Sequence, residues 1–302
     1  MSFRPGAEWM LVATAAIWGF AFVAQVKGME HVGPFTFNAA RFALGALSLL
    51  PLVLFFNSRA NDGREQPHVS GTSQRKWPPE IIGGLMAGLL LFAGATLQQV
   101  GLLYTTAANA GFITGLYVIL VPVIGRLLGH STPVTVWLGA LLALGGLYAL
   151  SIRDGLTLSR GDTLQLLGAF CWAGHVLLIE SLTRRCNTLW LALAQYGVCA
   201  ALSAIVAGFI EAPELSSIQA AAWAIAYAGL LSVGVAYTLQ ILAQRQVPAA
   251  RAAIIISLEG VFAALGGWWL LDQSLDGRAI TGCVLMLSGM IVAQYRFKPS
   301  YG

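Results

Sequence analysis

Glu259 is the one acidic residue near the middle of a long apolar stretch of this 302-residue sequence. Polar groups in such stretches are costly to bury, so each of them is a candidate functional residue. Burial favours the neutral form of a carboxyl group, and Glu259 could therefore carry a proton or bind a cation. Its alternative role is a hydrogen bond that fixes helix packing. Glu180 lies nearer the end of its stretch, where a surface ion pair with Arg184 is expected.

Two tryptophans and one arginine form a second group of candidates. Trp18 and Trp172 lie too deep in their stretches to anchor at a membrane interface, and their indole faces could line a cavity. Arg41 lies about 9 Å into its stretch, where its forked guanidinium could bind a carboxylate. Gln195 occupies the matching place in the second half of the sequence. For all four residues, a purely structural packing role is the alternative.

Uncharged donors and acceptors complete the candidates for a substrate pathway. They are Gln98, Asn109, Tyr117, His175 and Gln240. His175 lies one turn from Trp172, although a lone histidine in a membrane helix can equally serve packing. Cys171 precedes His175 by four residues, but no second close pair of Cys or His completes a metal site. We therefore expect neither a metal nor a cofactor.

Several enzyme classes are excluded by missing motifs. The sequence has no HExxH, no GxSxG and no GxxxxGK[ST], so metalloprotease, hydrolase and ATP-driven chemistry lack their residues. We expect no catalytic residues and no enzymatic activity. Transport by this chain would then draw on ion or solute gradients, or run downhill.

The composition is that of a membrane protein. Apolar residues make up 57% and charged residues 10%, whereas soluble domains carry roughly 25% charged residues. Four cysteines are too few for a disulfide scaffold, and the net charge of +4 indicates topology rather than nucleic-acid binding. Ten stretches are long enough to cross a bilayer core of about 30 Å as helices. They span about 8–26, 35–56, 81–103, 107–128, 134–152, 162–182, 189–210, 218–240, 248–271 and 278–295.

Charge bias predicts the orientation of these helices. With the N-terminus inside, the inner loops and tails hold twelve Lys and Arg residues and the outer loops hold four. This bias predicts that both termini are cytoplasmic. Only the loop 57–79 is long, and its polar, Gly- and Pro-containing composition predicts a mobile cytoplasmic tether rather than a domain.

The two halves of the sequence resemble each other. The matches run in order at offsets of 142, 143 and 154 residues: Thr96-Leu97-Gln98 with Thr238-Leu239-Gln240, Gly139 with Gly282, Gly146 with Gly289, and Trp18 with Trp172. They predict two five-helix repeats, 1–153 and 160–296. Because five is odd, the second repeat is inverted in the membrane, which is a design of many secondary transporters. The alternative is a duplicated bundle that transports nothing.

Several motifs resemble those of a known family. They are Ala16-Ile17-Trp18-Gly19, Asn38-Ala39-Ala40-Arg41-Phe42, Gly111-Phe112-Ile113-Thr114-Gly115-Leu116-Tyr117, Phe170-Cys171-Trp172-Ala173 and Ser257-Leu258-Glu259-Gly260-Val261. The sequence is similar to the EamA family of the drug/metabolite transporter superfamily over nearly its whole length. Similar proteins usually have Pro where this chain has Gly260, a departure that could change the bend of the ninth helix.

The resemblance implies an all-α membrane protein of ten helices that exports amino acids, other metabolites or drugs. We expect a secondary-active exporter of the bacterial inner membrane that works by alternating access. Its expected partners are a small-molecule substrate, the lipid bilayer and a coupling proton, without nucleic acid. The rival interpretations are a small-solute channel and a non-transporting scaffold or sensor. Substrate, coupling ion, direction and oligomeric state stay open at this point.

Overall fold

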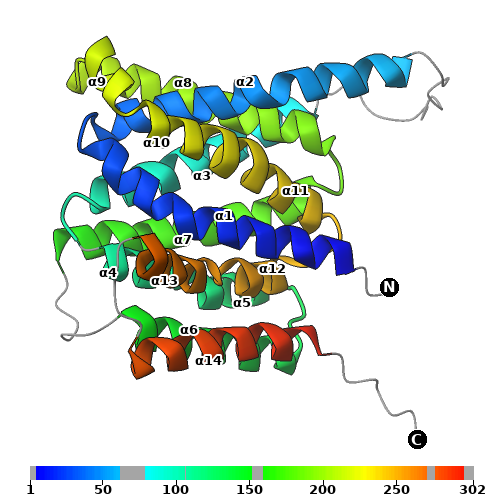
Figure 1. The fold of residues 1–302 in the computed structure, drawn as a ribbon. Coiled ribbons are helices and arrows are strands. Elements are labelled where there is room, and N and C mark those ends of the chain that lie inside the picture. The colour runs from blue at the N-terminus through cyan, green and yellow to red at the C-terminus, as the bar shows by residue number, and fades with distance from the viewer. Residues whose placement is uncertain (1–4, 62–78, 106, 152–158, 271–275, 296–302) are drawn as a thin grey trace, which may run out of the picture.

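The structure is a computed structural model, and it describes residues 5–61, 79–105, 107–151, 159–270 and 276–295. In these ranges the chain forms a bundle of long helices (Figure 1). In chain order the helices are α1 (Pro5–Met29), α2 (Pro34–Asn61), α3 (Pro79–Gly101), α4 (Ala107–Gly115), α5 (Tyr117–Leu127), α6 (Val134–Ser151), α7 (Arg160–Leu182), α8 (Thr188–Ile210), α9 (Leu215–Ala220), α10 (Ala222–Ala226), the π-helix η1 (Tyr227–Tyr237), α11 (Thr238–Gln244), α12 (Ala249–Ile256), α13 (Glu259–Leu270) and α14 (Gly277–Gln294).

These helices make ten crossings of the bundle. Nine helical stretches of the described chain are long and apolar enough to span a membrane, and Val134–Leu150 adds a shorter apolar helix. The crossings are α1, α2, α3, α4–α5, α6, α7, α8, α9–α11, α12–α13 and α14. The predicted ten-helix membrane fold is therefore confirmed. We call the end at which α1 begins and α14 ends the termini end, and the other the opposite end (Figure 1).

Part of the predicted loop 57–79 is helical in the structure. Helix α2 continues to Asn61, and α3 begins at Pro79. The prediction of a loop was thus wrong for residues 57–61, which continue the helical hydrogen-bonding pattern beyond the apolar stretch. The predicted tether itself, residues 62–78, lies outside the described residues.

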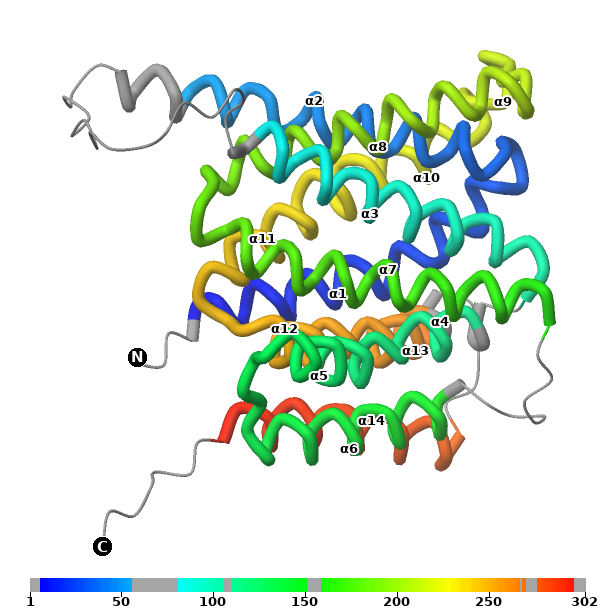
Figure 2. The backbone as a smooth tube through the Cα atoms, turned by 180° about the vertical axis from the view of Figure 1, so that it is seen from behind, coloured from blue at the N-terminus to red at the C-terminus, as the bar shows by residue number. Residues whose placement is uncertain are grey.

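The contacts between crossings follow the symmetry of an inverted repeat. Helix α2 packs on α8, and α6 packs on α14, so the second and fifth crossings each meet their own counterpart. Helix α3 packs on α7 and α8, and the corresponding eighth crossing packs on α1 and α2 through η1. Exchanging each crossing with the one five further along leaves this pattern unchanged, as an inverted repeat requires. Figure 2 shows α6 and α14 together at one edge of the bundle.

Glycines bring α6 and α14 into close contact. A Cβ atom on Gly139 would lie 2.5 Å from the carbonyl oxygen of Gly289, and one on Gly146 would lie 2.6 Å from that of Gly282. Gly139 matches Gly282 in the sequence repeat, and Gly146 matches Gly289. The repeat therefore maps one of these two contacts onto the other. Small residues allow the helix backbones to approach, which gives van der Waals contact where lipid offers no hydrophobic driving force.

Two equivalent crossings, the fourth and the ninth, are broken near their middle. Helix α4 ends at Gly115 and α5 begins at Tyr117, while α12 ends at Ile256 and α13 begins at Glu259. At both breaks the backbone makes tighter bonds to the residue three back, from Leu116 N to Ile113 O and from Leu258 N to Ile255 O. The stretches predicted as continuous at 107–128 and 248–271 are thus interrupted. The ninth crossing breaks even though Gly260 stands where similar proteins have Pro.

A carboxylate at the opposite end joins the two repeats. Glu211 accepts hydrogen bonds from the backbone N–H groups of Phe35 and Thr36, at 2.9 and 2.7 Å, and from the Thr36 hydroxyl. These N–H groups lie in the first turn of α2, where the helix leaves them without internal partners. An acidic group there also interacts favourably with the helix dipole. Glu211 thereby fixes the end of α8 to the start of α2.

Replacing Gly146 by Ala should lower the melting temperature of the detergent-solubilised protein. The new methyl group would lie 2.6 Å from the Gly282 oxygen, and overpacking of this kind costs roughly 1–3 kcal/mol. Gly145→Ala is the matched control, because a Cβ on Gly145 meets no atom within 4 Å. Equal melting temperatures for the two variants would contradict the close contact of α6 with α14.

Candidate substrate cavity

One cavity lies near the middle of the bundle and is lined by both repeats. Its walls come from α1, α2, α3, α4, α5, α7, η1, α11, α12 and α13. The volume that the centre of a water-sized sphere can reach in this cavity is about 50 Å³. A single buried water needs roughly 10–15 Å³ on the same measure, so the cavity has room for a group larger than one water molecule. The cavity is therefore a narrow space shared by the two repeats.

Most of the residues predicted from the sequence meet in this cavity. Eight of them line it: Trp18, Arg41, Gln98, Tyr117, Trp172, His175, Gln240 and Glu259. Gln195 lies behind the wall, where its Oε1 atom is 2.9 Å from His175 Nε2. Asn109 belongs to α4, and its side chain lies outside the described part of the structure. The proximity of these side chains is a structural finding, whereas their roles in transport stay predictions.

An aromatic cluster forms one wall of the cavity, with Tyr237 at its centre. The ring centroid of Tyr237 lies 4.5 Å from that of Trp18 and 6.3 Å from that of Trp172. The Trp18 Nε1–H donates to the carbonyl oxygen of Ser232 at 3.1 Å. The Nε1–H of Trp172 is buried and has no hydrogen-bond acceptor among the described residues. The two tryptophans of the repeats thus face a shared space, with a tyrosine between them.

Tyr237 and Ser232 were missed from the sequence. Tyr237 is the last residue of η1, directly before the repeated Thr238-Leu239-Gln240 motif. That position next to a repeated motif was the available signal. Ser232 contributes its backbone carbonyl rather than its side chain, so its residue type gives no indication of its role. π-Helices are rare, and those of a single turn occur frequently at functional sites.

Glu259 and Tyr117 meet across the two broken crossings. The Tyr117 hydroxyl donates to Glu259 Oε1 at 3.1 Å. The two residues are 142 positions apart, the offset of the Thr-Leu-Gln repeat, so each is the counterpart of the other. Each begins the second helix of its crossing, next to the break. The hydrogen bond therefore lies where the two repeats face each other, and Glu259 stays partly accessible from the cavity.

Arg41 lines the cavity with an uncompensated charge. Its side chain is 3% exposed, and its guanidinium carbon lies 5.6 Å from the ring centroid of Phe37 and 5.0 Å from that of Phe42. Within the described ranges it forms no ion pair, and its Nε atom has no hydrogen-bond partner. The faces of the two rings stabilise the cation by cation–π attraction. Its repeat counterpart Gln195 is likewise buried, and its Nε2 atom has no partner among the residues that the structure describes.

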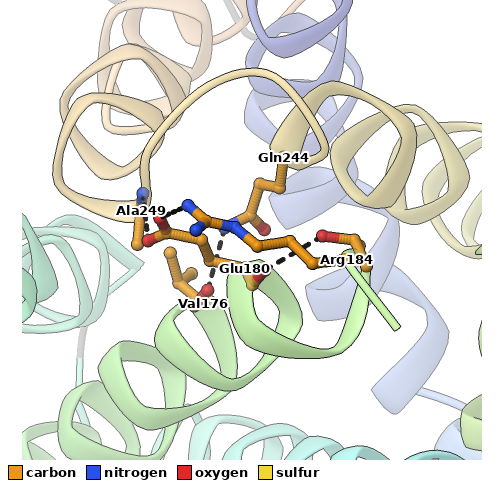
Figure 3. A network of polar contacts seen from close by, with 6 residues as sticks. Val176, Glu180, Arg184, Gln244 and Ala249 are labelled. Atoms are coloured by element: carbon orange, nitrogen blue, oxygen red, sulfur yellow. Dashed lines mark hydrogen bonds and ion pairs between the residues drawn. The ribbon is translucent and has the colours of Figure 1, made fainter. Parts of the chain in front are cut away.

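A polar network lies below the cavity at the termini end. Gln240, in the cavity wall, donates from Nε2 to Gln244 Oε1 at 3.0 Å, and Gln244 Nε2 donates to the carbonyl of Val176 at 2.8 Å. One turn further, Glu180 Oε2 accepts from the backbone N–H of Ala249 at 2.9 Å (Figure 3). These bonds join α7 to both α11 and α12. We call the bonds of Glu180 and Gln244 the termini-end latch.

The expected ion pair of Glu180 with Arg184 is present. It is more exposed to solvent than the hydrogen bond of Glu180 with Ala249. Arg184 lies 2.9 Å from Glu180 Oε1, and its side chain is 68% exposed, against 12% for Glu180. Sequence spacing along one helix predicted this pair. The bond from Ala249 connects residues 69 positions apart, and such a distant partner has no local signal in the sequence.

Replacing Glu180 by Ala should speed hydrogen–deuterium exchange in the first turn of α12. The variant leaves the Ala249 N–H without its acceptor, at a cost of about 1–3 kcal/mol. Arg184→Ala is the matched control, since it removes only an exposed ion pair worth roughly 0.2–1 kcal/mol. Mass spectrometry of the peptide that contains Ala249 measures the effect. Equal exchange in the two variants would show that the buried bond does not hold α12.

The comparisons with known proteins agree with the fold. Ten crossings in two inverted repeats around a mid-bundle polar site are the architecture of secondary transporters. The sequence profile of the EamA-like transporter family matches residues 6–152 and 159–294. The chain therefore belongs to the EamA-like transporter family, within the drug/metabolite transporter superfamily. It is a multi-pass membrane transporter, and this family is generally not enzymatic.

Similar proteins come from archaea and bacteria. An uncharacterized transporter of Archaeoglobus fulgidus is 32% identical over 291 residues, which cover 95% of this chain and 85% of the relative. The uncharacterized transporter YoaV of Bacillus subtilis is 23% identical over 294 residues, covering 95% and 96%. A solved crystal structure covers 97% of each chain with a TM-score of 0.78 at 20% identity, which supports the fold alone.

Proposed function

We propose that this transporter is a secondary-active exporter of small metabolites or drugs that works by alternating access. The central observation is the arrangement of its crossings around the cavity. On one side, α1 packs with η1, α11, α12 and α13; on the other, α7 packs with α3, α4 and α5. The repeat exchanges these two groups. Two equivalent groups around one site can rock between two related states, which is the mechanical requirement of alternating access.

The described state favours closure at the termini end. There, α12 packs on α5 and α7, α11 packs on α7, and the termini-end latch adds hydrogen bonds between the same groups. At the opposite end, the described helices of the two groups meet mainly where α4 touches α13, and less extensively. The Lys and Arg bias of twelve to four supports a cytoplasmic location for the termini end. Under this orientation, the cavity is closed toward the cytoplasm.

Glu259 is the proposed carrier of the coupling proton. Among the residues that line the cavity it is the one carboxyl group, and it shares the cavity with the candidate substrate contacts Trp18 and Trp172. Such a group can bind a proton in one state and release it in the other. Moving one charge across 100 mV is worth roughly 2.3 kcal/mol, enough for about a fiftyfold gradient. The inner membrane of a bacterium, our expected location, maintains such a potential.

Replacing Glu259 by Gln should abolish pH-driven accumulation of substrate while leaving counterflow exchange measurable. The variant keeps the shape of the side chain and removes its titration. The assay is uptake of a labelled metabolite panel into proteoliposomes with and without a pH gradient. Tyr117→Phe is the matched control, because it removes the hydrogen bond to Glu259 and retains the titratable group. Accumulation at the native rate by the Gln variant would show that Glu259 serves helix packing and does not carry the coupling proton.

The same assay separates the rival functions. A channel would equilibrate solutes without accumulating them against a gradient, irrespective of the residue at position 259. A scaffold or sensor would show no flux for any solute of the panel. Of these candidates, only a proton-coupled carrier gives gradient-driven accumulation by the native protein that is lost in the Gln variant.

Cys186 should react with maleimides only from the cytoplasmic side. It lies between α7 and α8 at the termini end, next to Arg184 and Arg185, and its side chain is partly accessible. In a variant whose other three cysteines are replaced by Ala, an impermeant maleimide should label it only after cells are permeabilised. Cys283 alone in the same background serves as the comparison for background labelling. Strong labelling of Cys186 in intact cells would reverse the proposed orientation.

A further inference from the structure

The buried guanidinium of Arg41 raises a question of charge balance. Arginine does not lose its charge in proteins, and a buried charge without a partner is strongly unfavourable. In the described structure, Arg41 has two phenylalanine rings nearby but no carboxylate within ion-pair distance. Its Nε atom has no hydrogen-bond partner among the described residues, and the side chain lines the cavity that a ligand would occupy. An anionic group in the cavity would supply the missing partner.

Glu259 does not fill that role. It is the one carboxyl group among the lining residues, and its Oε1 atom accepts from Tyr117 instead. It stands in α13 at the break of the ninth crossing, whereas Arg41 stands in α2. The cavity therefore holds one unpaired cation and one separately bonded carboxyl group. The guest that completes this charge pattern carries a negative charge of its own.

The other residues that line the cavity indicate the shape and polarity of the rest of the ligand. Tyr237 and Trp172 are stacked, with an interplanar angle of 29°, and Trp18 lies against the same tyrosine. Flat apolar groups pack well on such rings. Aromatic rings beside one cation are complementary to an acid with a flat apolar body.

We propose that the cavity binds small organic carboxylates, with the carboxylate paired to Arg41 and an aromatic or apolar body against Trp18, Trp172 and Tyr237. This inference rests on the proposed function and names its substrate class. The planar fork of the guanidinium can pair both carboxylate oxygens, which makes the contact specific as well as strong. Amides of the same acids have the same shape and lack the charge, so they are the discriminating probes.

The test compares acids with their amides by binding to the detergent-solubilised protein. The probes are phenylacetate with phenylacetamide and indole-3-acetate with indole-3-acetamide, titrated by calorimetry. We expect the native protein to bind at least one acid about tenfold or more tightly than its amide, from the strength of a charged hydrogen bond. Equal affinities for both pairs, or no binding of either acid, would overturn the proposal.

Variants of Arg41 test whether this residue causes the preference for acids over amides. Arg41→Gln should remove the difference between acid and amide, and Arg41→Lys should keep part of it, because a lysine retains charge without the fork. If Arg41→Gln does not fold, the Lys variant and the native acid-to-amide ratio still decide the matter. A merely structural arginine would lower stability on substitution and leave the ratio unchanged in the Lys variant.

A second control separates this proposal from that of the coupling proton. Glu259→Gln should retain the preference for acids over amides, because Glu259 does not pair with Arg41. Loss of pH-driven accumulation with retained acid binding supports both proposals. Retained accumulation with retained acid binding refutes the proton role of Glu259 alone, and loss of the preference in Glu259→Gln contradicts the separate role of Arg41.

Discussion

The hydrogen bond between Tyr117 and Glu259 is the contact around which the two halves of this transporter are arranged. It joins the first residues of α5 and α13, directly after the breaks of the fourth and ninth crossings. Those broken crossings need support from outside, and they receive it from α6 and α14, which pack on them and on each other through glycines. The central hydrogen bond, the two broken crossings and the close packing of α6 on α14 are thus structurally connected.

The sequence predicted the crossings well because the bilayer imposes a simple requirement on length and polarity. It also predicted that Trp18 and Trp172 would be related, because the repeat is visible in the residues themselves. The breaks were not predictable in the same way. Pro122 lies within α5 without ending it, whereas the backbone tightens at Leu116, directly after Gly115, and at Leu258, two residues before Gly260. Glycines also lie inside many of the unbroken helices, so residue type alone did not indicate where these two crossings stop.

The sequence predicted most of the residues that line the cavity, but not the contacts between them. The scarcity of polar residues in apolar stretches was enough to select Arg41, Gln240 and Glu259. The bonds that decide their environment join distant parts of the chain, such as Glu180 with Ala249, and spacing along one helix cannot reveal them. Tyr237 was missed for the same reason, since its importance comes from the rings around it rather than from its own neighbours in sequence.

The two repeats differ at the termini-end latch. At the repeat offsets of 142 and 154, the positions of Gln244 and Glu180 correspond to Leu102 and Val26. Closure at the opposite end would therefore lack the hydrogen-bonding side chains of the termini-end latch, and Leu102 and Val26 would contribute apolar contact in their place. Apolar association strengthens on warming from low temperature, because its driving force near 25 °C is mainly entropic. Under alternating access, temperature itself would shift the resting population between the two states, so that cold favours the hydrogen-bonded closure.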